Sequence, residues 1–143
     1  MARIDRARLD AADIKFVTEI PPRYTDLDPQ KHVNNAAVAA IIQESRLRFQ
    51  TAARVPELLA GRRILVAAVS IEYAGETLFP DPIEIAVGIL KLGETSVTLG
   101  HRGRQGGRAT FYAQTVLVCC NSEGEPTAVP PAMREVYEGL RIA

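Results

Sequence analysis

Arg23-Tyr-Thr-Asp-Leu-Asp-Pro-Gln-Lys-His-Val-Asn-Asn35 is the stretch that decides the fold, because it leads directly into a long helical pattern. The first backbone N–H groups of a helix have no partner within the helix, and they favour nearby negative charge. A carboxylate placed beside them could attack an acyl group or activate water, while the helix end binds the developing oxyanion. The same residues could also be an ordinary helix cap. The rest of the chain must therefore decide between the two.

The helical pattern covers residues 35–53, and Pro56 lies just beyond its predicted end. The run from Ala36 to Ile42 is apolar all round, which predicts a helix that is buried on most sides. Such a helix would be about 27 Å long. One face continues at helical spacing through Val38, Ile42, Ser45 and Phe49.

Strand-like segments lie on both sides of this helix. Residues 15–24 form a first short strand, which Pro21-Pro22 limits to a sheet edge or a bend. Further β-rich or alternating segments are 64–73, 83–89, 96–99 and 109–120, followed by a short C-terminal helix at 132–140. Four consecutive strands joined by short turns are expected to pair antiparallel, with the helix on one face of an α+β fold. The open sheet edge predicts at least a dimer.

Composition limits the classes of function. The 143 residues fit one domain over 15–143, preceded by a segment 1–14 that is either loosely ordered or a short helix. A net charge of zero argues against a mainly electrostatic nucleic-acid or membrane-surface binder. No apolar run reaches the roughly 20 residues of a membrane span, and the N-terminus has no signal-peptide pattern.

The only two cysteines, Cys119 and Cys120, are adjacent in a predicted strand. Neighbouring strand residues point to opposite faces, so a disulfide between them is not expected. Two small buried thiols in a reduced protein are the expected state, which together with the composition predicts a cytoplasmic location.

The motifs resemble those of the hotdog-fold acyl-CoA thioesterases of the 4-hydroxybenzoyl-CoA thioesterase type. That family shows D-x-D, then H-V-N-N, then a helix with E-x-R. The matching segments here are Asp26-Leu27-Asp28, His32-Val33-Asn34-Asn35 and Glu44-Ser45-Arg46. Later similarities are Ile71-Glu72-Tyr73, the turn into Pro80-Asp81-Pro82-Ile83 and the Leu92-Gly93 turn, so the resemblance covers roughly residues 15–130.

This resemblance implies a five-stranded antiparallel sheet wrapped around the long helix. It also implies dimers or tetramers with active sites at subunit interfaces. The implied substrate is a thioester of coenzyme A or acyl carrier protein. It would be hydrolysed without a metal or redox cofactor, so coenzyme A would take part only as a portion of the substrate.

Asp28 matches the reactive carboxylate of the family. It could attack the thioester to form a mixed anhydride, or act as general base on water. Taken alone, Asp-Pro beside a helix start could equally be a turn or a capping interaction, worth about 0.5–2 kcal/mol. With the complete motif present, catalysis is the favoured interpretation.

The neighbouring motif residues receive different roles. The backbone N–H of Asn35 matches the oxyanion donor of the family, and Asn34 is the expected cap as well as a candidate substrate-binding residue. Asp26 is interpreted as structural, binding loop backbone or Arg23. His32 could polarise the carbonyl or position water, or it could merely bond neighbouring backbone.

Asp28 and His32 are spaced like two ligands of a metal. The only other histidine, His101, lies in a distant strand, so no third ligand is evident and no metal is expected.

Glu44 is the reserve candidate for the catalytic carboxylate, because some hotdog enzymes use an acid on the helix. Its alternative is a structural pair with a nearby arginine. Arg102, Arg104 and Arg108 surround a hairpin tip and could bind coenzyme A phosphates, or could simply be solvated. The small residues from Ala36 to Ala40 could widen an acyl pocket or allow tight packing.

Two other functions stay open. A non-catalytic hotdog module would bind acyl-CoA without turnover, and a hotdog dehydratase or hydratase would use a different Asp/His arrangement, which this motif matches poorly.

Overall fold

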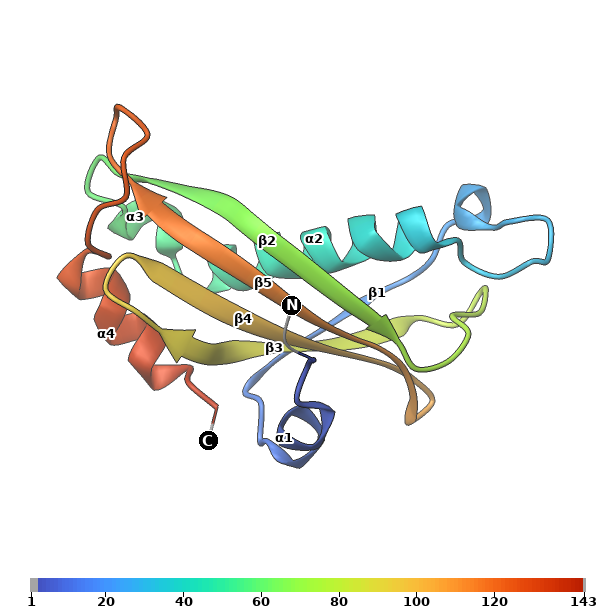
Figure 1. The fold of residues 1–143 in the computed structure, drawn as a ribbon. Helices are drawn as coiled ribbons and strands as arrows, with labels where there is room; N and C mark the ends of the chain where they lie inside the picture. The colour runs from blue at the N-terminus through green and yellow to red at the C-terminus, as the bar shows by residue number, and fades with distance from the viewer. Residues whose placement is uncertain (1–2, 143) are drawn as a thin grey trace.

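The computed structural model describes residues 3–142, so Met1, Ala2 and Ala143 of the predicted ranges 1–14 and 15–143 lie outside the described residues. Figure 1 shows one five-stranded antiparallel sheet curved along a long helix, which confirms the predicted α+β hotdog architecture. The elements are α1 (Arg6–Ala11), β1 (Phe16–Ile20), a 3-10 turn (Tyr24–Asp26), α2 (Asn35–Ala52), α3 (Val55–Leu58), β2 (Arg63–Tyr73), β3 (Ile83–Leu92), β4 (Ser96–Gln105), β5 (Arg108–Cys120) and α4 (Pro131–Gly139).

The strand order is β1-β3-β4-β5-β2, so β2 and β1 are the two edges of the sheet. This corrects the expectation that all four later strands pair with their neighbours in sequence. Strand β2 pairs with β5, from Arg63 opposite Cys120 to Tyr73 opposite Phe111, and not with β3. The connection at 74–82 is too long for a tight hairpin, and its two prolines cannot donate to a ladder. It therefore carries the chain from one side of the sheet to the other.

One face of α2 forms the core with the sheet. Val38, Ile42 and Phe49 are almost fully buried there. The opposite face is exposed, which corrects the prediction of a helix buried on most sides: Ala36, Ala39 and Ala40 all face outward. The physical reason is that the sheet covers only one side of α2 within a single chain.

The outer face of the sheet carries the N-terminal segment. Of the two possibilities for residues 1–14, the structure shows the short helix α1, with Leu9 fully buried beneath it. Gly100 of β4 makes this close approach possible, because a Cβ there would lie 2.7 Å from Cδ2 of Leu9. The guanidinium of Arg102 donates to the Leu9 carbonyl at 2.8 Å, and the Tyr112 hydroxyl donates to Asp10.

A buried polar cluster joins α2 to the sheet. His101 of β4 is fully buried, with Nδ1 3.2 Å from the Ser45 hydroxyl and Nε2 3.0 Å from the Thr115 hydroxyl. Because Ser45 donates its own proton to the Ile42 carbonyl, it must accept from Nδ1–H, and Nε2 then accepts from Thr115. Burial, with the charge of Arg46 as a smaller cause, lowers the pKa of His101 to about 3. The ring is therefore a neutral structural group in one tautomer.

Candidate active site

The loop before α2 is held in shape by Asp26. This residue is buried, accepts from the backbone N–H of Arg23 at 2.8 Å, and pairs with the Arg23 guanidinium at 3.0 Å. Burial alone would raise the pKa of Asp26, but the hydrogen bonds and charge of Arg23 outweigh it and keep the pKa below its ordinary value. The Asp26 carbonyl also accepts from Asn34 N–H at 2.9 Å. Its geometry matches the predicted structural role.

Asp28 lies at the centre of a tight turn. One carboxylate oxygen accepts from the backbone N–H groups of Gln30, at 2.9 Å, and His32, at 3.1 Å. The Asp28 N–H in turn donates to the His32 carbonyl at 2.9 Å. The side chain is fixed through one oxygen, and its carboxylate lines a cavity together with Asn35.

The start of α2 provides hydrogen-bond donors beside this carboxylate. Asn34 is the N-cap, since its side-chain oxygen accepts from Ala37 N–H at 2.7 Å. Asn35 is the first helical residue, and within residues 3–142 its backbone N–H donates no hydrogen bond. Free donors of this kind, at the positive end of a helix, favour an oxyanion.

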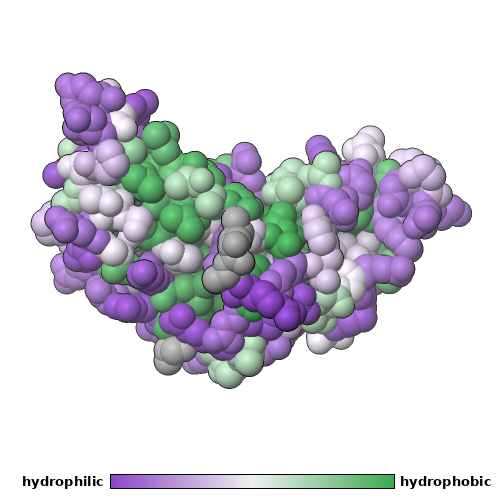
Figure 2. All heavy atoms as spheres, viewed as in Figure 1, coloured by the Kyte–Doolittle hydropathy of each residue, from purple (hydrophilic) through white to green (hydrophobic). Residues whose placement is uncertain are grey.

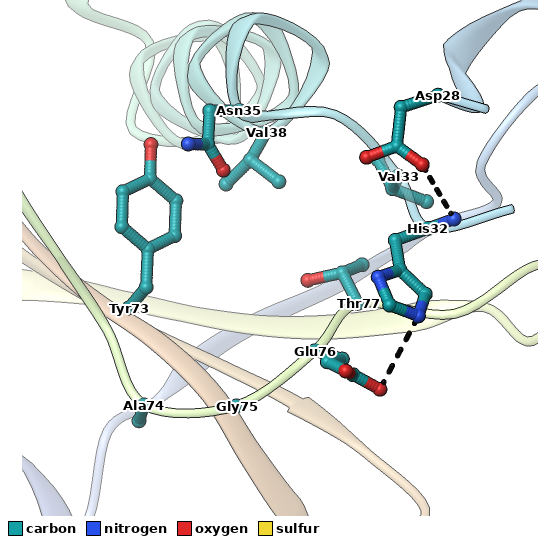
Figure 3. Close-up of a pocket in the computed structure, with 10 residues that line it drawn as sticks. All are labelled: Asp28, His32, Val33, Asn35, Val38, Tyr73, Ala74, Gly75, Glu76 and Thr77. Carbon is teal, nitrogen blue, oxygen red and sulfur yellow. Dashed lines mark hydrogen bonds and ion pairs between the residues drawn. The ribbon is translucent and has the colours of Figure 1, made fainter. Parts of the chain in front are cut away.

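The cavity at this junction has a volume of about 450 Å³. Figure 3 shows Asp28 and His32 on one side and Tyr73 on the other, with Asn35 and Val38 of α2 above. The wall opposite α2 is the segment Tyr73–Thr77, at the end of β2 and in the connection that follows it.

Sequence reasoning missed this second wall. Only the prolines at 80 and 82 and the interruption of strand character by Ala-Gly-Glu-Thr at 74–77 marked the connection as irregular. Nothing in the sequence of the connection at 74–82 indicated that it contacts residues 28–35.

Backbone contacts join the two walls. Val33 N–H donates to the Thr77 carbonyl at 2.9 Å, and His32 and Leu78 form an isolated antiparallel bridge. Nε2 of His32 also lies 3.4 Å from a carboxylate oxygen of Glu76. The structure thus brings Asp28, His32 and Asn35 of the predicted set to one cavity, whereas the Asn34 side chain caps α2 and is not among the residues that line the cavity.

Glu44 is not part of this cavity. It is exposed on the outer face of α2 and pairs with Arg48, one turn later, at 2.5 Å. It lines a different and smaller hollow of about 170 Å³ with Arg23 and Ala40. This geometry matches the alternative of a structural ion pair, and it places the reserve carboxylate away from Asp28 within the chain.

The three hairpin arginines also bind other groups of the same chain. Arg102 donates to the Leu9 carbonyl and Arg104 pairs with Asp10 at 3.3 Å, both on the outer face of the sheet that α1 covers. Arg108 donates to the Glu76 carbonyl at 2.7 Å, behind the second wall of the cavity. The structure therefore does not gather them as a phosphate-binding cluster beside Asp28.

The side chains and helices of residues 3–142 lack the features of a metal site and of a membrane span. Within residues 3–142, no group of three or more His, Cys, Asp or Glu side chains is placed to hold a metal ion. Across that same range, none of the helices combines the length and the apolar character needed to span a membrane.

Comparisons with known proteins agree with this fold. A thioesterase of Thermus thermophilus, complexed with coenzyme A and Zn, superposes with a TM-score of 0.78 at 28% identity, over 89% of this chain and 94% of that one. A protein of Bacillus stearothermophilus described as a predicted thioesterase has a TM-score of 0.80 at 24% identity, covering 88% and 96%. No curated protein matches the chain. The model of the thioesterase-like superfamily matches residues 22–137, and the chain belongs to that superfamily.

Proposed function

We propose that the protein hydrolyses acyl thioesters, with coenzyme A or acyl carrier protein as the thiol portion and Asp28 as the reactive carboxylate. The observation that carries the proposal is that Asp28 lines the same cavity as the start of α2, where the Asn35 N–H is free of other described partners. The coenzyme A bound to the Thermus thioesterase supports coenzyme A as the thiol portion. The motif resemblance supports the 4-hydroxybenzoyl-CoA thioesterase type.

The chemistry requires one water for each thioester. As general base, Asp28 takes a proton from water while the water oxygen attacks the carbonyl carbon. As nucleophile, Asp28 itself attacks, the thiolate leaves, and water then cleaves the mixed anhydride. In both routes the negative charge moves to the carbonyl oxygen and then to the departing sulfur. The helix start would stabilise the first of these charges.

Asp28→Asn tests the role of the carboxylate. The amide oxygen can still accept from the Gln30 and His32 N–H groups, so the turn should keep its shape while losing its charge and basicity. We expect kcat to fall by about 10²–10⁴ for hydrolysis of acyl-CoA, measured by thiol release from short, long and aryl thioesters. Asp13→Asn, at an exposed position remote from the cavity, is the matched control.

The outcomes separate the possible functions. Full activity in Asp28→Asn would remove Asp28 from the mechanism. Thioester binding without thiol release by the unaltered protein would indicate the non-catalytic module, and hydration of an enoyl-CoA would indicate the hydratase. In a single turnover in ¹⁸O-water, label in the Asp28 carboxylate would identify the nucleophilic route, with water attacking the aspartyl carbon of the mixed anhydride.

We also propose that the protein is a dimer, formed through the edge of β2. Val66, Val69 and Tyr73 of this edge strand are each nearly half exposed. They lie on the side of the sheet facing α2, and the outward-facing residues in the first part of α2 include the small residues Ala36, Ala39 and Ala40. An antiparallel β2–β2 pairing about a twofold axis would complete the hydrogen bonds of both edges and cover these apolar groups.

A second apolar patch supports further association into a tetramer. It lies on the outer face of the sheet, where Figure 2 shows hydrophobic side chains gathered over β2 and β5. Leu65 is 44% exposed there, and Val116 and Val118 beside it are partly exposed.

The two buried free cysteines support the proposed cytoplasmic location.

A further inference from the structure

The second wall of the cavity is held from behind by the β4–β5 hairpin. The buried amide of Gln105 accepts from Leu78 N–H at 2.9 Å and donates to the carbonyls of Leu78, at 2.8 Å, and Asp81, at 2.9 Å. Arg108, just after the turn, donates to the Glu76 carbonyl at 2.7 Å. These bonds fix the backbone on both sides of Thr77, so the Glu76 side chain starts from a defined position.

On the side that faces the cavity, the Glu76 side chain contacts the loop that carries Asp28. Its carboxylate lies 3.4 Å from Nε2 of His32, and the backbone N–H of His32 donates to Asp28 at 3.1 Å. Figure 3 shows the imidazole with Nε2 toward Glu76 and Nδ1 toward the cavity. A continuous set of contacts therefore runs from Arg108 through Glu76 and His32 to Asp28.

We propose that Glu76 is a positioning residue, whose carboxylate orients the His32 imidazole across the cavity and fixes its tautomer. The proposal rests on the proposed thioesterase function. A carboxylate at Nε2 accepts the Nε2 proton, which leaves Nδ1 of the neutral ring as an acceptor facing the cavity. In that state the ring can accept a hydrogen bond from the attacking water, and in its protonated state Nδ1–H can donate to the thioester or to the departing sulfur.

Charged groups from both walls of the cavity lie near His32. Asp28 faces it from its own loop, Glu76 faces it from the opposite wall, and Lys31 is its exposed neighbour in the chain. Glu76→Gln keeps the size of the side chain but replaces the charged acceptor at Nε2 with a neutral amide.

The two histidines make a direct test possible. His32 and His101 are the two histidines of the sequence, so a ¹⁵N NMR spectrum of the histidine rings contains two ring systems to assign. We expect Glu76→Gln and Glu76→Ala to reduce the Nε2–H share of the neutral His32 ring, read from its ¹⁵N shifts. Glu135→Gln, which changes an exposed acid on α4, should leave this share unchanged.

Activity provides the second readout. We expect kcat of Glu76→Gln to fall several-fold with little change in KM. An unchanged His32 tautomer would overturn the proposal, as would a changed tautomer with an unaltered kcat. Because the NMR measurement needs no turnover, absence of thiol release by the unaltered protein would instead refute the proposed function.

Discussion

Acid should weaken this fold through His101 in a calculable way. The folded pKa of this residue is about 3, because the ring is fully buried, whereas an unfolded histidine titrates near pH 6.5. Between these two values the unfolded chain binds a proton that the folded chain excludes, so stability rises with pH across this window and is lost as the pH falls below about 6.5.

The size of the effect follows from the same values. Going from pH 8 to pH 5, the free energy of unfolding should fall by about 2 kcal/mol on account of His101 alone. At pH 5 the unfolded imidazole is almost fully protonated and the folded one almost fully neutral. The result therefore depends on the unfolded value and hardly on the folded one. Asp26, whose pKa is lowered in the fold, contributes only as the pH falls below its unfolded value near 4, outside the measured range.

Urea unfolding at pH 8, 7, 6 and 5 checks this reasoning. His101→Gln keeps a donor and an acceptor for Ser45 and Thr115 but does not titrate. It should start less stable than the unaltered protein, and the difference in unfolding free energy should shrink by about 2 kcal/mol at pH 5. His32 is present in both proteins and cancels. Parallel stability curves from pH 8 to pH 5 would refute the buried neutral histidine.

Two further predictions concern the helix start and the sheet edge. Asn34→Ala removes the acceptor for Ala37 N–H and should cost about 0.5–2 kcal/mol, lowering Tm by a few degrees in calorimetry, whereas Asn34→Ser should keep most of the cap. Equal melting of these two variants would show that the cap is not needed. Val69→Lys should halve the mass measured by sedimentation, since it places a charge in the proposed β2–β2 interface. Val17→Lys, on the other edge and similarly exposed, should not, and a Val69→Lys protein that sediments like the parent would exclude this interface.

Local sequence signals were enough to predict the helix and its entry. Asn34 caps α2, and the first helical residue is Asn35, because a side-chain acceptor and an apolar run adjoin there. The Pro21-Pro22 pair ended β1 at Ile20, shorter than predicted, because proline cannot continue the ladder. For Glu44, Arg48 four residues later on the helix supported the alternative of a structural ion pair, which the structure shows.

Contacts between distant segments could not be predicted in this way. Arg102 and Arg104 reach the N-terminal helix from positions more than 90 residues away, and no local pattern records such a pairing. The same holds for Glu76, whose backbone is set by Arg108 and whose side chain meets His32. The side of the site formed by residues 28–35 is therefore predictable, because one continuous motif supplies it. The side formed by Tyr73–Thr77 is not, because the sheet topology places it.

The strand order has a consequence for how the chain is made. The three central strands, β3 to β5, are the last to leave the ribosome, while β1, α2 and β2 come earlier and pack around them. During synthesis the apolar face of α2 therefore cannot pack against the sheet until Ile83 and later residues emerge. Folding must wait for these long-range pairings, which are slow to form. Substitutions that strengthen the β3–β4–β5 meander should accelerate folding of the whole chain more than equal stabilisation of α2.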